Sequence, residues 1–176
     1  HHNAAQRRRV DTHSNPGASR WRICVQNCTL LPRLTESLTM SVTVAELQTA
    51  LSDLFAPWVQ ELGLRVHDVP ADAAVVLRLP HSERLARMGG TLCGQAMMAA
   101  CDTAMVLALM RHFGQFRPCT TVQMSTSFLK PLSGQDALVT VRLSRVGKGT
   151  AFGEADLSGA ADGKSVCRAS LVYALL

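Results

Sequence analysis

The most distinctive pattern in the chain is an apolar stretch that runs from Leu92 to Met110. Gln95 and Asp102 are its only strongly polar side chains, and most of the others are small or aliphatic. A run of this length predicts one buried helix, which we place at 88–112 because two glycines open it. A carboxylate in such a helix is costly unless it is paired, hydrogen-bonded or used in function, so Asp102 is the first candidate for chemistry.

Before this helix, the pattern predicts a second helix and a strand. The pair Thr43 and Glu46 is a capping-box signature, and apolar residues recur behind it every three or four positions. We therefore expect one amphipathic helix that ends at Gly63. The stretch 64–79 is typical of a strand interrupted by a proline, and 81–90 is typical of a polar loop.

After residue 114 the pattern changes to an alternation of apolar and polar positions, which predicts strands. Four strands are expected, at 121–128, 139–144, 150–157 and 165–175. On the first of them one face would carry Val122, Met124, Thr126 and Phe128, and the other Thr121, Gln123, Ser125 and Ser127. Short connections predict an antiparallel meander. The element order indicates an α+β fold in which a curved antiparallel sheet wraps around one long helix.

Length and charge separate the N-terminal segment from the rest. The 176 residues fit one domain, but residues 1–39 lack a sustained pattern and carry a net charge of +4 out of +5 for the whole chain. We expect 1–39 to be a disordered or non-native extension and 40–176 to be the domain, with a transit peptide as the alternative for the extension. The remainder is nearly neutral and has no nucleic-acid-binding motif, so no nucleic-acid partner is expected.

Cysteine usage and the central carboxylate bear on the compartment. The six cysteines form no C-x-x-C pair, and Cys93, Cys101 and Cys167 lie in apolar or alternating surroundings. They are best explained as small buried side chains in a reducing compartment, so a cytoplasmic protein is expected. The apolar stretch is nearly long enough to span a membrane, but Asp102 at its centre would cost roughly 2.5–3.5 kcal/mol there. No membrane partner is therefore expected.

Three segments resemble the motifs of one enzyme family. Residues 89–105 (G-G-T-L-C-G-Q-A-M-M-A-A-C-D-T-A-M) resemble the central motif of the PaaI-like acyl-CoA thioesterases. Residues 121–131 and 145–155 resemble the strand and the hairpin that follow in that family. The resemblance covers about residues 43–176 and implies the hotdog fold. Many members have His-Gly-Gly where this chain has Cys93-Gly94-Gln95, and other branches have Ser-Gly-Pro, so the histidine is not required.

The resemblance implies hydrolysis of an acyl-CoA or aroyl-CoA thioester to the free acid and CoA. The backbone N–H of Gly94 or Gln95 would stabilise the oxyanion, and Asp102 would act as general base or as nucleophile. Thr121 matches a position where relatives orient water. Gly94 and Asp102 are separated by about 12 Å of helix, so the antiparallel helix pair of the family implies a site shared between two subunits. The alternative for Asp102 is a structural carboxylate held by hydroxyls or by a helix N-terminus.

Five further residues are expected to contact the substrate. Gln95 and Cys93 would lie beside the acyl group, and Arg87, Arg145 and Lys148 would face a carboxylate or the CoA phosphates, although each could equally be a solvated side chain. The resemblance implies no metal and no cofactor beyond the CoA of the substrate. It implies a homodimer, and we expect a dimer of dimers. The alternative function is a non-catalytic acyl-CoA-binding hotdog protein with a regulatory role. A hotdog dehydratase is disfavoured because no histidine stands at Cys93.

Overall fold

The computed structural model describes residues 42–72 and 74–176, and the expectations for residues 1–39 lie outside this part of the chain. The helices are α1 (Val44–Asp53), α2 (Pro57–Gln60) and α3 (Gly94–Phe113), with a 3₁₀ turn at Glu83–Leu85. The strands are β1 (Arg65–Asp68), β2 (Val75–Leu79), β3 (Ala86–Arg87), β4 (Thr91–Leu92), β5 (Cys119–Phe128), β6 (Ala137–Val146), β7 (Thr150–Gly159) and β8 (Ser165–Leu175).

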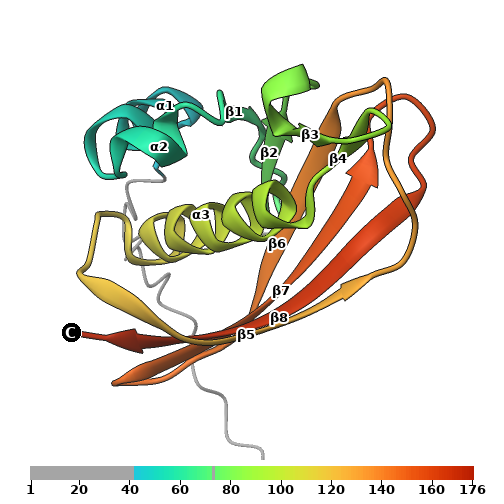
Figure 1. The fold of residues 1–176 in the computed structure, drawn as a ribbon. Helices are drawn as coiled ribbons and strands as arrows, with labels where there is room; N and C mark the ends of the chain where they lie inside the picture. The colour runs from blue at the N-terminus through green and yellow to red at the C-terminus, as the bar shows by residue number, and fades with distance from the viewer. Residues whose placement is uncertain (1–41, 73) are drawn as a thin grey trace, which may run out of the picture. The chain divides into compact units, whose positions relative to one another are not determined.

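One sheet of six strands in the order β1-β2-β6-β7-β8-β5 forms the body of the described part. Every neighbouring pair in it is antiparallel. Figure 1 shows the sheet curving around α3, which lies across its concave side, with α1 and α2 on the far side of that helix. The predicted hotdog arrangement of a curved antiparallel sheet around one long helix is confirmed.

Small side chains let α3 approach the sheet closely. Ala100, Ala104 and Ala108 are at most 1% exposed. Gly153 on β7 leaves room for Met105, because a Cβ at this glycine would lie 2.5 Å from the Met105 sulfur. The helix is long and apolar enough to span a membrane by length and composition, yet 56% of its apolar stretch is buried inside the fold. Its hydrophobicity is therefore explained by its place in the core.

The prediction of one helix that runs unbroken to Gly63 is wrong, because α1 ends at Asp53 and a separate helix, α2, begins at Pro57. Proline has no N–H for the carbonyl four residues earlier, and its ring clashes with that turn. At the first position of α2 the missing N–H costs nothing. The capping box is confirmed: the Glu46 N–H donates to Thr43 Oγ1 (3.2 Å) and the Thr43 N–H to Glu46 Oε2 (2.7 Å).

The central helix begins six residues later than expected, at Gly94. Gly89 and Gly90 adopt positive φ values of 90° and 72°, which are favourable for glycine, and they turn the small hairpin of β3 and β4. The two glycines therefore form the turn of a hairpin and, contrary to the prediction, do not begin the helix. The strand expected at 64–79 is likewise two antiparallel strands, β1 and β2, on either side of the loop that holds Pro70.

The expected meander holds for β6, β7 and β8 but not for β5, which pairs with β8 at the edge of the sheet. Three strand spacings, about 14 Å, separate β5 from β6. The connection from Leu129 to Asp136 can span about 26 Å when extended, so it is long enough to cross the end of the sheet. A turn-like sequence between two strands thus does not require them to pair.

Candidate active site

The N-terminus of α3 presents unpaired backbone donors. Cys93 is the N-cap residue and its side chain makes no capping hydrogen bond, while its N–H donates to Leu85 O at 2.8 Å. The first helical N–H with an acceptor is that of Met97. The N–H groups of Gly94, Gln95 and Ala96 have none among the described residues. Such groups carry the partial positive charge of the helix dipole, so this end of α3 can stabilise an oxyanion.

Gly94 is needed here for space as well as for access. A Cβ at this position would lie 3.0 Å from Cζ of Phe128, the last residue of β5. Glycine therefore lets the end of β5 close over the first turn of α3. The Phe128 side chain remains 53% exposed, so the ring has room to shift.

Asp102 is held by two hydroxyl groups on one oxygen. Thr121 Oγ1 on β5 donates to Asp102 Oδ1 at 2.8 Å, and the Tyr173 hydroxyl on β8 donates to the same oxygen at 2.5 Å. Asp102 is half-buried and makes no ion pair within the described part of the chain. Its charge is thus stabilised by hydrogen bonds without being neutralised by a cation.

A β-bulge places Thr121 on the helix side of the sheet. Simple alternation predicts that Thr121 and Met124 face opposite sides, and this is wrong. The pairing of β5 with β8 shifts between Thr121 and Gln123, so the extra residue Val122 points outward and is 63% exposed. Thr121 then shares its face with Met124, and its hydroxyl reaches Asp102.

Tyr173 is the site residue that sequence reasoning missed. It pairs directly with Thr121 across β5 and β8, it is 1% exposed, and its hydroxyl also donates to the main-chain oxygen of Asp102 at 3.0 Å. Burial first, and then the hydrogen bond to the Asp102 carboxylate, raise the pKa of this phenol far above its usual range. The alternation of β8 could have identified Tyr173. It stands between Leu171 and Leu175 on the apolar face of the strand, and its hydroxyl is a polar group on that face.

A pocket with a volume of about 380 Å³ lies beside the start of α3. Gly94, Met97 and Phe128 form part of its wall, and the cationic residues Arg87 and Lys130 also line it. Neither cation makes an ion pair with another described residue. Arg87, expected to face a substrate carboxylate or a CoA phosphate, thus lines the same pocket as Gly94 and Lys130, and its role stays a prediction.

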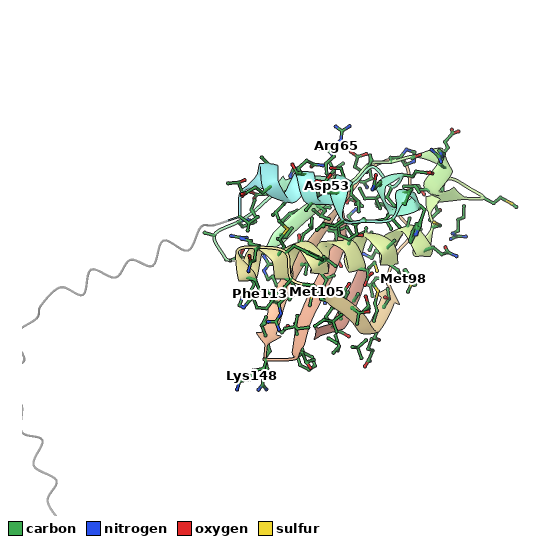
Figure 2. All side chains as sticks on the ribbon, turned by 90° about the vertical axis from the view of Figure 1, so that its left-hand side faces the viewer. Asp53, Arg65, Met98, Met105, Phe113 and Lys148 are labelled. Carbon is green, nitrogen blue, oxygen red and sulfur yellow. The ribbon has the colours of Figure 1, made fainter. Side chains whose placement is uncertain are left out.

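Arg145 and Lys148 lie at the other end of α3. Lys148 stands in the β6–β7 turn, and its carbonyl oxygen accepts a hydrogen bond from Arg117, whose guanidinium lies over the Phe113 ring. Figure 2 shows Lys148 and Phe113 toward one end of the helix and Met98 toward the other. About 28 Å of helix separates the two ends. Arg145, also exposed, follows a second bulge on β6 close to this turn. Within one chain, these two cations are therefore not part of the pocket at Gly94.

The other predicted contacts lie at the helix start. Gln95 is exposed on the first turn of α3, and Cys93 is half-buried at the N-cap. Gly94 and Asp102 stand about 12 Å apart on the same helix, as the spacing requires. Among the described residues, no group of three His, Cys, Asp or Glu side chains could hold a metal ion. The structure thus brings Asp102 together with Thr121, and Gly94 together with Arg87, at two separate places on the described part of the chain.

Comparisons with known proteins add to this geometry. Residues 89–165 match the family model of the thioesterase superfamily, whereas no curated protein shows significant sequence similarity. A thioesterase from Haemophilus influenzae superposes with a TM-score of 0.69 at 17% identity, over 77% of this chain and 91% of that chain. A candidate thioesterase from a Silicibacter species gives a TM-score of 0.67 at 27% identity, over 76% and 91%. A hypothetical thioesterase from Streptococcus pneumoniae, crystallised with coenzyme A, superposes with a TM-score of 0.58 at 18% identity, over 64% of this chain and 85% of that chain.

These matches confirm the predicted recognition at the level of the superfamily, and they confirm the hotdog fold. They support thioester hydrolysis as the general class of reaction. The PaaI-like subtype remains a prediction. The matched segment, residues 89–165, includes Gly94, Asp102 and Thr121, and through it the chain is similar to the thioesterase superfamily.

Proposed function

We propose that the protein hydrolyses an acyl-CoA or aroyl-CoA thioester, with Asp102 as general base or nucleophile, in a site shared by two subunits. The observation that carries this proposal is the environment of Asp102. Its carboxylate is half-buried, is held by two hydroxyl groups and has no cationic partner in the described part of the chain. A charge that is oriented but not neutralised is suited to take a proton or to attack an electrophile.

The reaction needs two functions that α3 offers at different positions. In the general-base route, Asp102 takes a proton from water as the water oxygen bonds to the thioester carbonyl carbon. The oxyanion then accepts hydrogen bonds from the N–H of Gly94 or Gln95 until the C–S bond breaks, and the CoA thiolate takes the proton. In the nucleophilic route, Asp102 itself bonds to the carbonyl carbon and expels the thiolate, and water hydrolyses the resulting mixed anhydride. One oxyanion donor of this kind is worth about 2.7–4 kcal/mol.

Two uncovered surfaces support the shared site. Along the mostly apolar helix α3, Gln95 and Met98 are exposed and Asp102 is half-buried. Strand β5, which carries Thr121, lies at the sheet edge, so one row of its backbone groups has no strand partner among the described residues. A second copy placed with its α3 antiparallel would cover both surfaces. It would also bring its Asp102 to the Gly94 of the first copy, which no single chain can do.

The pocket at Gly94 supports a CoA ester as the substrate class. Apolar walls from Met97 and Phe128 suit an acyl or pantetheine chain, and the cations Arg87 and Lys130, which make no ion pair with another described residue, suit the negative charges of CoA. The Streptococcus pneumoniae neighbour was crystallised with coenzyme A, which fits this class. If Arg145 and Lys148 contact CoA at the Gly94 pocket, they do so from the second subunit, because within one chain they lie near the opposite end of α3. Four free cysteines in the described part are compatible with the cytoplasm.

The test is hydrolysis of a panel of acyl- and aroyl-CoA esters, followed as CoA thiol release, by the wild type and by Asp102→Asn. We expect turnover of at least one ester and a fall in kcat of about 10²–10⁴-fold in the variant, with unchanged thermal unfolding. Asp156→Asn is the matched control, because Asp156 pairs with Arg168 away from the candidate site. Saturable binding of the whole panel without turnover would identify the regulatory acyl-CoA-binding alternative. Full activity of Asp102→Asn would remove Asp102 from the mechanism.

The backbone donor can be tested at Gly94 itself. Proline removes the N–H but is favoured at the first position of a helix, and the preceding Cys93 already has the φ of −72° and ψ of 148° that a following proline requires. Gly94→Ala keeps the N–H and introduces the same contact with Phe128. If the Gly94 N–H stabilises the oxyanion, Gly94→Pro has a kcat about 10²–10³-fold below that of Gly94→Ala. Equal values would assign the donor to Gln95.

A further inference from the structure

The hydroxyl of Tyr173 makes two contacts with one residue. It donates to Asp102 Oδ1 at 2.5 Å and lies 3.0 Å from the main-chain oxygen of Asp102, so it ties β8 to the middle of α3. Thr121 on the neighbouring strand supplies the second donor to the same carboxylate oxygen. The other oxygen, Oδ2, has no hydrogen-bond partner among the described residues. The carboxylate therefore has one saturated oxygen and one free oxygen.

We propose that Tyr173 is a positioning residue which, together with Thr121, fixes Oδ1 of Asp102 so that Oδ2 alone meets water or the thioester. This inference rests on the proposed role of Asp102 and adds the residue that orients it. A free aspartate rotates about its Cα–Cβ and Cβ–Cγ bonds and presents either oxygen. Two donors from adjacent strands remove that freedom, and misplacing a reacting group by about 1 Å can cost about 10²-fold in rate.

The sheet is built to bring the two donors together. Thr121 and Tyr173 are direct partners in the pairing of β5 with β8, and the bulge at Val122 turns Thr121 toward the helix. Without the bulge, Thr121 would face away from Asp102 and the phenol would be the only donor. Tyr173 is 1% exposed, so its position is fixed by packing on all sides. The orientation of the carboxylate is thus set by the register of two strands.

The phenol can act as a donor but is not suited to proton transfer. Burial first, then the hydrogen bond to Asp102, and then the negative charges of Asp102 and of an ionised Cys119 raise the pKa of this phenol far above its usual range, and Thr121 opposes this only in part. In the part of the chain that the structure describes, Asp102 and Cys119 are the titratable groups that face the hydroxyl. Tyr173 therefore holds its proton more firmly than an ordinary phenol, and it holds the carboxylate without competing for the proton of the attacking water.

The first test is Tyr173→Phe, which keeps the buried ring and removes only the hydroxyl. We expect kcat to fall about tenfold to a hundredfold, the usual worth of a hydrogen bond to a charged group, with KM changed less than about twofold. Thr121→Val should do the same. Thr126→Val, on the same face of β5, is the matched control and should leave kcat unchanged, because its hydroxyl has no partner in the described part of the chain.

A double-mutant cycle separates positioning from a structural role. If Tyr173 acts through Asp102, adding Tyr173→Phe to Asp102→Asn lowers kcat no further. If the two losses multiply, Tyr173 acts elsewhere and the inference is wrong. A normal kcat in Tyr173→Phe, together with an inactive Asp102→Asn, would also overturn the positioning role of Tyr173 while leaving the proposed function intact. Full activity of Asp102→Asn would instead contradict the proposed function.

One readout needs neither activity nor a Tyr173 variant. The chain has a single tyrosine, so its ionisation can be followed by absorbance in isolation from any other phenol. In the wild type we expect tyrosinate to appear only together with unfolding, measured by far-UV circular dichroism. In Asp102→Asn, which has lost the hydrogen-bonded carboxylate and its negative charge beside the phenol, tyrosinate should appear at a lower pH than in the wild type. The same titration in both proteins would show that the hydroxyl does not serve the carboxylate.

Discussion

At the scale of single residues, the site depends on hydroxyl groups in place of cations. An arginine or lysine beside Asp102 would hold the carboxylate equally well, but it would also neutralise the charge that the proposed reaction uses. Thr121 and Tyr173 hold Oδ1 with neutral donors, and the carboxylate keeps its net negative charge. The cost is a phenol buried next to a negative charge, and this cost has consequences for stability that can be measured.

The raised pKa of Tyr173 predicts a loss of stability in alkali. The folded protein binds the phenolic proton more tightly than the unfolded chain, whose phenol has the ordinary pKa of 10.0. The stabilising contribution is therefore complete below pH 10 and declines as the pH rises above it, by at most about 1.4 kcal/mol per pH unit. Urea unfolding of the wild type and of Tyr173→Phe from about pH 8 to pH 11 isolates this contribution, because the other titrating groups are common to both.

The free energies of unfolding of the two proteins should run parallel below pH 10 and converge above it. A constant difference across the whole range would mean that the phenol titrates alike in the folded and unfolded chains. Such a result would contradict both the buried hydrogen bond and the pKa direction derived from it.

Thr126 makes a second prediction at this scale. Its Oγ1 is buried and has no hydrogen-bond partner in the described part of the chain, which is costly for a hydroxyl. Valine has the same shape without the polar atom, so Thr126→Val should raise the free energy of unfolding by about 1 kcal/mol in urea titrations. Destabilisation instead would show that a second subunit provides the missing partner.

At the scale of elements, β5 shows what alternation can and cannot tell. The strand itself, Thr121 as a candidate and the polar or apolar character of each position follow from the sequence. The bulge does not, because Val122 is apolar and fits the alternation as well as an inward residue would. The placement of β5 beside β8 also escapes prediction, since local sequence does not specify which strand lies across a connection.

Other features of the fold also divide into those that local sequence predicts and those that depend on the complete sheet. The capping box of α1 and the glycine after α3, Gly114, are local signals and are present in the structure. The break at Pro57 is also local and could have been predicted from the proline alone. Asp102 and Tyr173 are 71 positions apart, so their hydrogen bond depends on the complete sheet. Local chemistry is predictable from the sequence, whereas the second donor to Asp102 is a product of the fold.

The packing of α3 on the sheet gives a prediction for Gly153→Ala. The added Cβ would lie 2.5 Å from the sulfur of Met105 and 3.2 Å from the carbonyl oxygen of Arg142. Met105 is fully buried and has little room to move, so we expect a loss of about 1–3 kcal/mol in the free energy of unfolding. Gly149→Ala in the β6–β7 turn is the control, because no atom lies within 4 Å of its added Cβ. Equal stability of the two variants would mean that α3 is not tightly packed against β7.

At the scale of the whole molecule, one chain carries both of the proposed chemical functions but cannot apply them to the same carbonyl. The N–H donors and Asp102 lie on one rigid helix, and no rearrangement of side chains shortens the distance of about 12 Å between Gly94 and Asp102. Each subunit of a symmetric pair would contribute the donor to one site and the carboxylate to the other. Damage to different functions in the two subunits should therefore leave one site intact.

This arrangement predicts complementation between two inactive variants. Asp102→Asn and Gly94→Pro chains are co-expressed with different affinity tags, and the mixed pair is isolated by two purification steps. One of its sites then combines the intact Gly94 of one chain with the intact Asp102 of the other, so we expect about half of the wild-type activity per pair. Mixed pairs in which both differently tagged chains carry Asp102→Asn control for the procedure and should stay inactive. If the Asp102→Asn and Gly94→Pro pair is no more active than the mean of its parents, Gly94 and Asp102 serve the same site from one chain or do not act together at all.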